Sequence, residues 1–264
     1  MKNKWKLGTY FGIGVYLHWS FLLLLGYVLL FGGGLIQALF LAMIFACVVA
    51  HEYGHVLTAR HFGIGTRDIT LYPIGGVAAL KSMPKRPSEE IMVALAGPAV
   101  NVVIAFVLAL FLIITGQFSA NLNSFSGFLT SVMFLNVILA GFNLLPAFPM
   151  DGGSVLRAWL ARKHDYATAT DKAARVGQVF AAIFAVIAIF TVNAMFFLLA
   201  AFVYMAAGAE RRQAFLERDA QTMGPRWQFS GSTFQFPSGR TTTPPPMPKR
   251  QSDREQVIDV EVIP

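Results

Sequence analysis

Charged side chains are scarce in this sequence. Only 13% of its 264 residues are Asp, Glu, Lys or Arg, whereas about 25% is usual for a soluble domain. Three long segments contain none of them: residues 7–50, 91–150 and 176–209. A buried helix of a soluble core accounts for about 10–14 apolar residues, and a helix that spans a bilayer needs about 20. This scarcity argues against a soluble globular protein and predicts an integral membrane protein.

Cysteine is nearly absent as well. The single residue, Cys47, excludes an intrachain disulfide and a cysteine-rich metal site. The first apolar segment is not followed by an A-x-A-like cleavage site, so we expect it to be retained and not removed as a signal peptide. The basic residues, which give a net charge of +7, lie in short loops between apolar segments. They therefore reflect membrane topology, and we expect no nucleic-acid partner.

The apolar segments predict six spanning helices. Their approximate bounds are 14–31, 35–59, 90–115, 125–146, 174–190 and 194–208. The breaks within each successive pair contain no Lys or Arg, and the other loops are basic, so the positive-inside rule places both termini in the cytoplasm. The block 176–209 could also form one long tilted helix. That alternative would export Arg211 and Arg212, and two spans are therefore preferred.

The chain divides into two regions. We expect an all-α polytopic membrane domain over residues 1–209, with a short membrane-associated β-rich loop. Residues 210–264 are polar and include the run Pro244-Pro245-Pro246. Such a segment buries too little apolar surface to fold alone, which predicts a disordered Pro-rich cytoplasmic tail.

The second predicted span contains His51-Glu52-Tyr53-Gly54-His55, an H-E-x-x-H pattern. Helical residues four positions apart lie on one face about 5–6 Å from each other, so two imidazoles can bind one zinc ion. The intervening Glu52 can then accept a proton from a water at the metal. A carboxylate at membrane depth costs several kcal/mol unless it is paired or liganded, which favours this function over a structural role for the three residues.

A catalytic zinc needs a third protein ligand and one open position. Most other acidic residues before the tail, among them Glu90, lie among basic loop residues, where solvated or ion-paired roles are expected. Asp151 differs because it closes a charge-free block, in a stretch whose prolines and glycines interrupt the helix at membrane depth. Asp151 is therefore the predicted third ligand, although an Asp that only caps the following helix would also fit this position.

Together, His51-Glu52-Tyr53-Gly54-His55 and the downstream segment Asn143-x-x-Pro146-x-x-Pro149-x-Asp151-Gly152 resemble the site-2 protease family of intramembrane zinc proteases. The resemblance covers about residues 8–208. It implies a metal inside the bilayer toward the cytoplasm, and hydrolysis of peptide bonds within or beside a substrate's transmembrane helix. Unlike some members of that family, the sequence shows no inserted PDZ domain and no C-terminal regulatory domain.

The resulting hypothesis is a zinc metalloendopeptidase with one Zn2+ per chain and Glu52 as the general base. Residues 68–80 predict a β-rich loop in which Gly75 and Gly76 permit close backbone approach, so that an unwound substrate could add as a strand. An ordinary hairpin between two spans is the alternative. The resemblance also implies that Asn143 and Pro146 shape the substrate cleft.

Two other functions fit parts of the pattern. A metal-ion transporter would use the same histidines and aspartate, but the first, fifth and sixth predicted spans carry almost no polar groups for an ion path. A catalytically inactive scaffold that binds membrane helices would not need an intact metal site. The expected partners are membrane-anchored protein substrates and the lipid bilayer, with a second copy of the chain or a regulatory membrane protein as further candidates. The expected location is a bacterial or archaeal plasma (inner) membrane.

Overall fold

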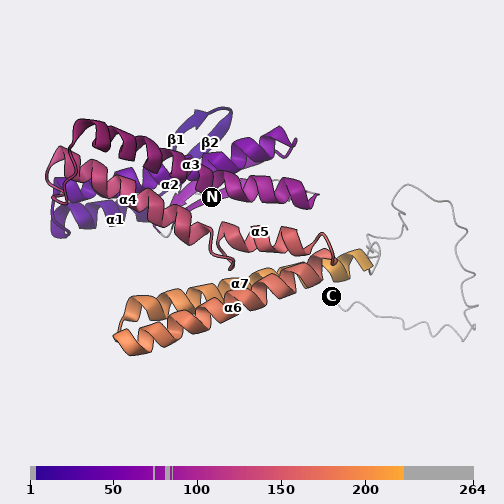
Figure 1. The fold of residues 1–264 in the computed structure, drawn as a ribbon. Helices are drawn as coiled ribbons and strands as arrows, with labels where there is room; N and C mark the ends of the chain where they lie inside the picture. Colours follow the sequence, from indigo (N-terminus) through magenta and orange to yellow (C-terminus); the bar gives the residue numbers. More distant parts are fainter. Residues whose placement is uncertain (1–3, 74, 81–83, 85, 223–264) are drawn as a thin grey trace, which may run out of the picture. The chain divides into compact units, whose positions relative to one another are not determined.

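The computed structural model describes residues 4–73, 75–80, 84 and 86–222. This part of the chain is mostly helical, with one small sheet (Figure 1). The helices are α1 (Trp19–Phe31), α2 (Leu35–His61), α3 (Pro87–Thr115), α4 (Phe125–Asn143), α5 (Asp151–Leu160), α6 (Tyr166–Thr191) and α7 (Ala194–Thr222). The strands are β1 (Lys4–Tyr10), β2 (Ile13–His18), β3 (Thr66–Tyr72) and β4 (Gly75–Leu80). The predicted class of helical, polytopic membrane protein is confirmed.

The predicted count of six spans is too high. Within the described residues, five helices are long and apolar enough to cross a membrane: α2, α3, α4, α6 and α7. Helix α1 has 13 residues, or about 20 Å at 1.5 Å per residue, which is shorter than the roughly 30 Å hydrocarbon core. Residues 14–18, which were assigned to the first span, belong to β2.

The physical reason for this error lies in the composition of β2. Its side chains alternate, with Ile13, Val15 and Leu17 buried and the residues between them only partly buried. Alternation with period two marks a half-buried strand. Because no charged residue occupies the outer face, the strand and the helix after it form one uninterrupted uncharged run.

The last apolar block forms two helices, as preferred from the sequence. Helix α6 ends at Thr191, and Val192 adopts a left-handed conformation with φ of 48°. Helix α7 then begins at Ala194 and continues to Thr222, so that residues 210–222, assigned to the tail, are helical. Residues 223–264 lie outside the described part of the chain, and the disordered tail stays a prediction.

The sheet has the order β1-β2-β3-β4. Its β2–β3 pair is parallel, and its two other pairs are antiparallel. The predicted β-rich loop, residues 68–80, coincides with the β3–β4 hairpin, whereas the two N-terminal strands were not predicted. Buried Ile69 of β3 packs with Val56 of α2, and Leu71 packs with Phe45 of α2. The sheet therefore lies against the helix that carries the H-E-x-x-H pattern.

Helices α2 and α3 pack closely because small residues face each other. A Cβ at Gly54 would lie 2.5 Å from the carbonyl oxygen of Ala96, which only glycine avoids. Helix α2 ends in a Schellman motif: Ile64 N–H donates to Ala59 O, and Gly63, with φ of 77°, donates to Arg60 O. Buried Ile64 packs with Ala59 and with Val93 of α3. These contacts bring the histidine-bearing face of α2 against α3.

Candidate metal centre

Two histidines of α2 converge on one point. His51 and His55 are one helical turn apart, and their Nε2 atoms lie 3.0 Å from each other. Both rings are largely shielded, with 8% and 12% of their side-chain surface exposed. This is the arrangement that the four-residue spacing predicts.

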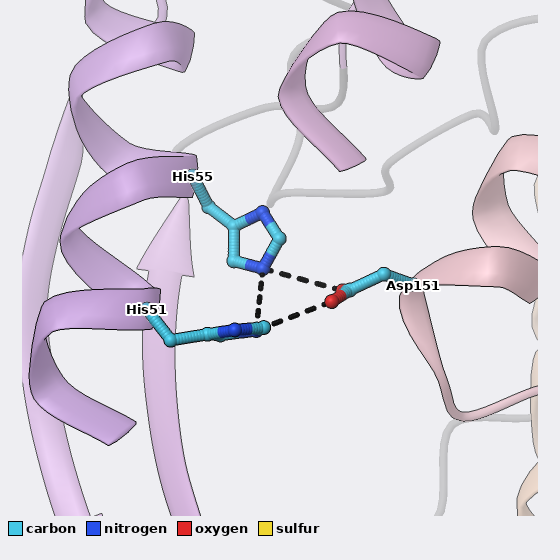
Figure 2. A group of neighbouring side chains, drawn as sticks. All are labelled: His51, His55 and Asp151. Atoms are coloured by element: carbon cyan, nitrogen blue, oxygen red, sulfur yellow. Dashed lines mark hydrogen bonds and ion pairs between the residues drawn. The ribbon is translucent and has the colours of Figure 1, made fainter. Parts of the chain in front are cut away.

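Asp151 reaches the same point from another element. It is the first residue of α5, and its Oδ2 lies 3.1 Å from Nε2 of His51 while its Oδ1 lies 3.3 Å from Nε2 of His55 (Figure 2). Met150 is the N-cap residue of α5, and its side chain makes no capping hydrogen bond. The Asp151 carboxylate points at the histidines instead of closing the helix end. The structure thus brings together the three predicted metal ligands.

The hydrogen bonds of the two rings fix where their protons lie. Nδ1 of His55 is 2.7 Å from the carbonyl oxygen of Val93, which can only accept, so Nδ1 carries the proton. Nδ1 of His51 donates in the same way to Oδ1 of Asn101 at 2.9 Å. In neutral rings the two Nε2 atoms then present lone pairs. Two lone pairs and a carboxylate directed at one point repel each other unless a cation lies between them.

The distances suit a tetrahedral zinc ion. Zn–N and Zn–O bonds of about 2.0–2.1 Å place two ligands of a tetrahedron about 3.3–3.4 Å apart. Here the two Nε2 atoms are 3.0 Å apart, and the Asp151 carboxylate lies 3.1 Å from Nε2 of His51 through Oδ2 and 3.3 Å from Nε2 of His55 through Oδ1. Oδ2 of Asp151 is also buried and has no hydrogen-bond partner among the described residues, although burying an unsatisfied carboxylate oxygen is costly. A bound cation would satisfy it, and this donor set of two imidazoles and one carboxylate fits zinc.

Gly97 of α3 leaves room for the ligands. A Cβ at this position would lie 2.7 Å from Nε2 of His51 and still closer to the ring of His55. Any residue other than glycine would therefore displace the ligand atoms or occupy the place of the metal. The site therefore requires the backbone of α3 to lie close to the two histidine rings, which glycine at this position allows.

Glu52 and two of the candidate ligands, His51 and Asp151, border a cleft of about 900 Å³. Its lining comes from several helices and from the β3–β4 hairpin. The polar side chains that line it are Ser20, His51, Glu52, Tyr72, Asn101, Asn143 and Asp151. Gly76 of β4 also lines this cleft, and a Cβ added there would lie 3.0 Å from Cγ of Glu52. The sheet therefore approaches the side chain that was predicted to be the catalytic base.

Of the four residues predicted to bind substrate, two line the cleft and two do not. Gly76 and Asn143 line the cleft. Gly75 pairs with Tyr72 at the turn of the β3–β4 hairpin. Pro146 is half-buried in the segment between α4 and α5 and is not among the described residues that line the cleft.

Comparison with known proteins identifies the family. The model of Peptidase family M50 matches residues 39–120 and 113–187, which together make up more than half of the chain and contain all three candidate ligands. The chain belongs to peptidase family M50. The resemblance to the site-2 proteases is thereby confirmed.

Several known proteins are similar to this chain in sequence or structure. A zinc metalloprotease of Methanocaldococcus jannaschii is 36% identical over 220 residues, which are 82% of this chain and 63% of that protein. Stage IV sporulation protein FB of Bacillus subtilis is 29% identical over 110 residues, 41% of this chain and 36% of that protein. The chain thus spans less than two thirds of the length of these relatives. The solved site-2 protease of M. jannaschii has a TM-score of 0.60 and 33% identity, covering 88% of this chain and 100% of that chain.

Sequence reasoning missed part of the site of this M50 chain. It assigned no role to Gly97 or to the carbonyl group of Val93. Every residue type has a backbone carbonyl, so the sequence could not have indicated the role of Val93. The sequence does show an Asn inside an uncharged span, Asn101, and a Gly next to a Pro, Gly97, and these could have been predicted to contribute to the site. Phe202 of α7, which also lines the cleft, lies in an apolar run that does not distinguish it from its neighbours.

Proposed function

We propose that the chain is an intramembrane zinc metalloprotease that hydrolyses peptide bonds in or near the transmembrane segments of membrane-anchored proteins. The observation that carries this proposal is the convergence of His51, His55 and Asp151 at the edge of a cleft that Glu52 also lines. A metal-binding role alone would explain the three ligands. It would not explain a second carboxylate beside them in a cleft large enough for a peptide segment.

The metal ligands and Glu52 would have different roles in the reaction. His51, His55 and Asp151 would hold one zinc ion through two nitrogen atoms and carboxylate oxygen. When bound, zinc lowers the pKa of a coordinated water and polarises a substrate carbonyl. Glu52 accepts the proton of the attacking water and passes it to the leaving amine, as a general base and then a general acid. Two carboxylates are among the described residues that line the cleft, Glu52 and Asp151. Because Asp151 would bind the metal, proton transfer is assigned to Glu52.

The β3–β4 hairpin provides a place for an unwound substrate. A peptide bond within a helix is shielded by its neighbouring turns, so the substrate must become extended before it is cleaved. Its freed backbone groups then need partners, because water is scarce at this depth. Strand β4 ends the order of the described sheet, and Gly76 brings it against Glu52. An extended segment that adds to β4 would lie along the cleft, with the amide of Asn143 as a further hydrogen-bonding group.

The depth of the site agrees with cleavage inside the membrane. His51 precedes the end of α2 at His61 by ten residues, or about 15 Å along the helix axis. Basic residues Arg60 and His61 occupy the last turn of α2, and the positive-inside rule places this end in the cytoplasm. The proposed site therefore lies in the cytoplasmic half of the bilayer, which we take to be a plasma membrane.

The test compares three purified proteins in detergent or nanodiscs: wild type, Glu52→Gln and Asp151→Asn. We expect wild type to hold one zinc ion per chain and to cleave a transmembrane peptide, with metal content measured by mass spectrometry and cleavage by product mass. Glu52→Gln should keep the zinc and lose cleavage by about 10²–10⁴-fold. Asp151→Asn should lower both zinc content and cleavage.

Glu89→Gln is the matched control, because Glu89 lies in the first turn of α3 and pairs with Arg86 away from the cleft. It should retain zinc and activity. Undiminished cleavage by Glu52→Gln would contradict the assignment of the base. Substrates can be sought by comparing membrane proteomes of cells that express wild type or Glu52→Gln, because an uncut substrate accumulates only with the variant.

A further inference from the structure

Arg157 of α5 is almost completely buried and joins four other segments. Its Nε and Nη2 atoms both lie 2.7 Å from Oε1 of Glu90 on α3. Nη1 lies 3.4 Å from Oε2 of Glu210 on α7. The guanidinium group also lies over the rings of Phe148, which precedes α5, and Tyr166 of α6, at 5.2 and 5.0 Å from their centroids. Only 4% of the side-chain surface of Arg157 and 8% of that of Glu90 is exposed.

One face of α3 contacts both elements that carry the candidate metal ligands. The residues of this face are three or four positions apart, so they follow each other along the helix: Glu90, Val93, Gly97 and Asn101. The last three contact the histidines of α2, through two hydrogen bonds and the close approach of the glycine. Glu90 binds Arg157 of α5 instead. Helix α3 is therefore the common support of a site whose ligands come from two different helices.

Stability alone does not explain the Glu90–Arg157 pair. Removing two charges from water is expensive, and apolar residues of similar volume often serve a buried position equally well or better. What an arginine adds is orientation, because two nitrogen atoms of its planar group bind one carboxylate and restrict angle as well as distance. Helix α5 needs such a restraint, since it has only ten residues and follows an irregular segment. Arg157 lies six residues after Asp151, or about 9 Å along the axis.

We propose that Glu90 and Arg157 are a positioning pair for the metal centre. By clamping α5 to α3, they set the place of the Asp151 carboxylate relative to the two imidazoles that α3 also orients. Neither residue touches the metal or the substrate. This inference rests on the proposed function, because it gives the pair a role toward the zinc ion that the site is proposed to hold.

The experiment measures zinc affinity, by competition with a chelator of known affinity, for the full chain in nanodiscs. Replacing Arg157 alone would leave the buried charge of Glu90 unpaired, so the main variant is the double substitution Glu90→Met/Arg157→Met. Glu210, the other partner of Arg157, has 38% of its side-chain surface exposed and stays hydrated in this variant. Methionine can pack against the rings of Phe148 and Tyr166, and we expect the variant to fold. Its zinc affinity should fall about 10–100-fold, the usual effect of removing a residue that orients a metal ligand.

Arg157→Lys is the second variant. It keeps the charge but replaces the planar fork with a single ammonium group, and its zinc affinity should fall about 10-fold. The matched control is Asp171→Asn/Arg211→Gln, which removes an ion pair between α6 and α7 without touching α3 or α5. Its zinc affinity should equal that of wild type. The thermal unfolding temperature of each metal-free protein shows whether a loss of affinity only reflects a loss of fold.

The outcomes separate this inference from the proposed function. If wild type binds no zinc at the site, the proposed function fails. If wild type binds zinc and Arg157→Lys binds it equally tightly, the positioning role is overturned, whether or not the double variant folds. A folded double variant with wild-type zinc affinity overturns it as well.

Discussion

Oδ1 of Asn101 accepts a hydrogen bond of 2.9 Å from Nδ1 of His51. Asn101 is completely buried on α3, fifty residues after the histidine that it orients. The bond holds the proton of His51 on Nδ1 and turns the lone pair of Nε2 toward the metal position. Partners of this kind fix both the tautomer and the direction of a metal-binding imidazole.

Asn101→Leu should therefore weaken zinc binding by about 10–100-fold, because the ring of His51 loses the acceptor that orients it. Asn136→Leu is the matched control. Asn136 is also completely buried, but it bonds to Cys47 and to the carbonyl oxygen of Val132 instead of to a ligand. Chelator competition should show a loss for the first variant only. Equal zinc affinity in both variants would contradict the orienting role of Asn101.

Gly97→Ala should abolish stoichiometric zinc binding. The added methyl group would overlap the ligand nitrogen atoms of His55 and His51, so the rings would have to leave their positions. Gly141→Ala on α4 makes the same chemical change where a Cβ meets nothing within 4 Å. Metal analysis of the two purified proteins should show one zinc ion per chain in Gly141→Ala only. Full zinc occupancy in Gly97→Ala would show that the site is built differently.

Gly76→Ala should separate metal binding from cleavage. Its methyl group would lie 3.0 Å from Cγ of Glu52 and 3.1 Å from Cγ1 of Val48, so it would crowd the base without reaching the ligands. We expect unchanged zinc content and a fall in kcat/KM of up to about 100-fold, the cost of displacing a catalytic group by about 1 Å. Gly26→Ala on α1, where a Cβ meets nothing within 4 Å, should cleave as wild type does. Normal cleavage by Gly76→Ala would argue against close contact between β4 and Glu52.

Removal of the metal should destabilise the protein. A ligand that binds only the folded state and is present at 100 times its Kd adds about 2.7 kcal/mol of stability. Thermal unfolding in detergent should therefore occur at a lower temperature after chelation, and readdition of zinc should restore both stability and cleavage. Asp151→Ala serves as the reference, because its unfolding temperature should respond far less to zinc. An equal response in both proteins would locate the stabilising metal elsewhere.

The parts of the site that were predicted from the sequence follow from local rules. The four-residue spacing of His51 and His55 places them on one helix face. Asp151 stood out because few carboxylates lie at membrane depth, where an unpaired one is costly. Glu90 was assigned instead to a solvated or ion-paired role among basic loop residues, and the structure shows it 6% exposed in an ion pair with Arg157. Its partner lies 67 residues away, a distance at which spacing carries no information.

The sequence by itself determined that this is a membrane protein and which residues are the candidate metal ligands, because charge scarcity and helical periodicity are local properties of the chain. Only the tertiary structure decided that residues 4–18 form two strands of a sheet, and that Gly97 and Asn101 stand against the histidines. These features depend on which surfaces of distant elements meet. Within the long uncharged segments, many apolar surfaces are alike in composition, so composition does not select which of them pack together. The complementary shapes of the helices, the close approach that glycines allow and the few buried hydrogen bonds determine which surfaces pack together.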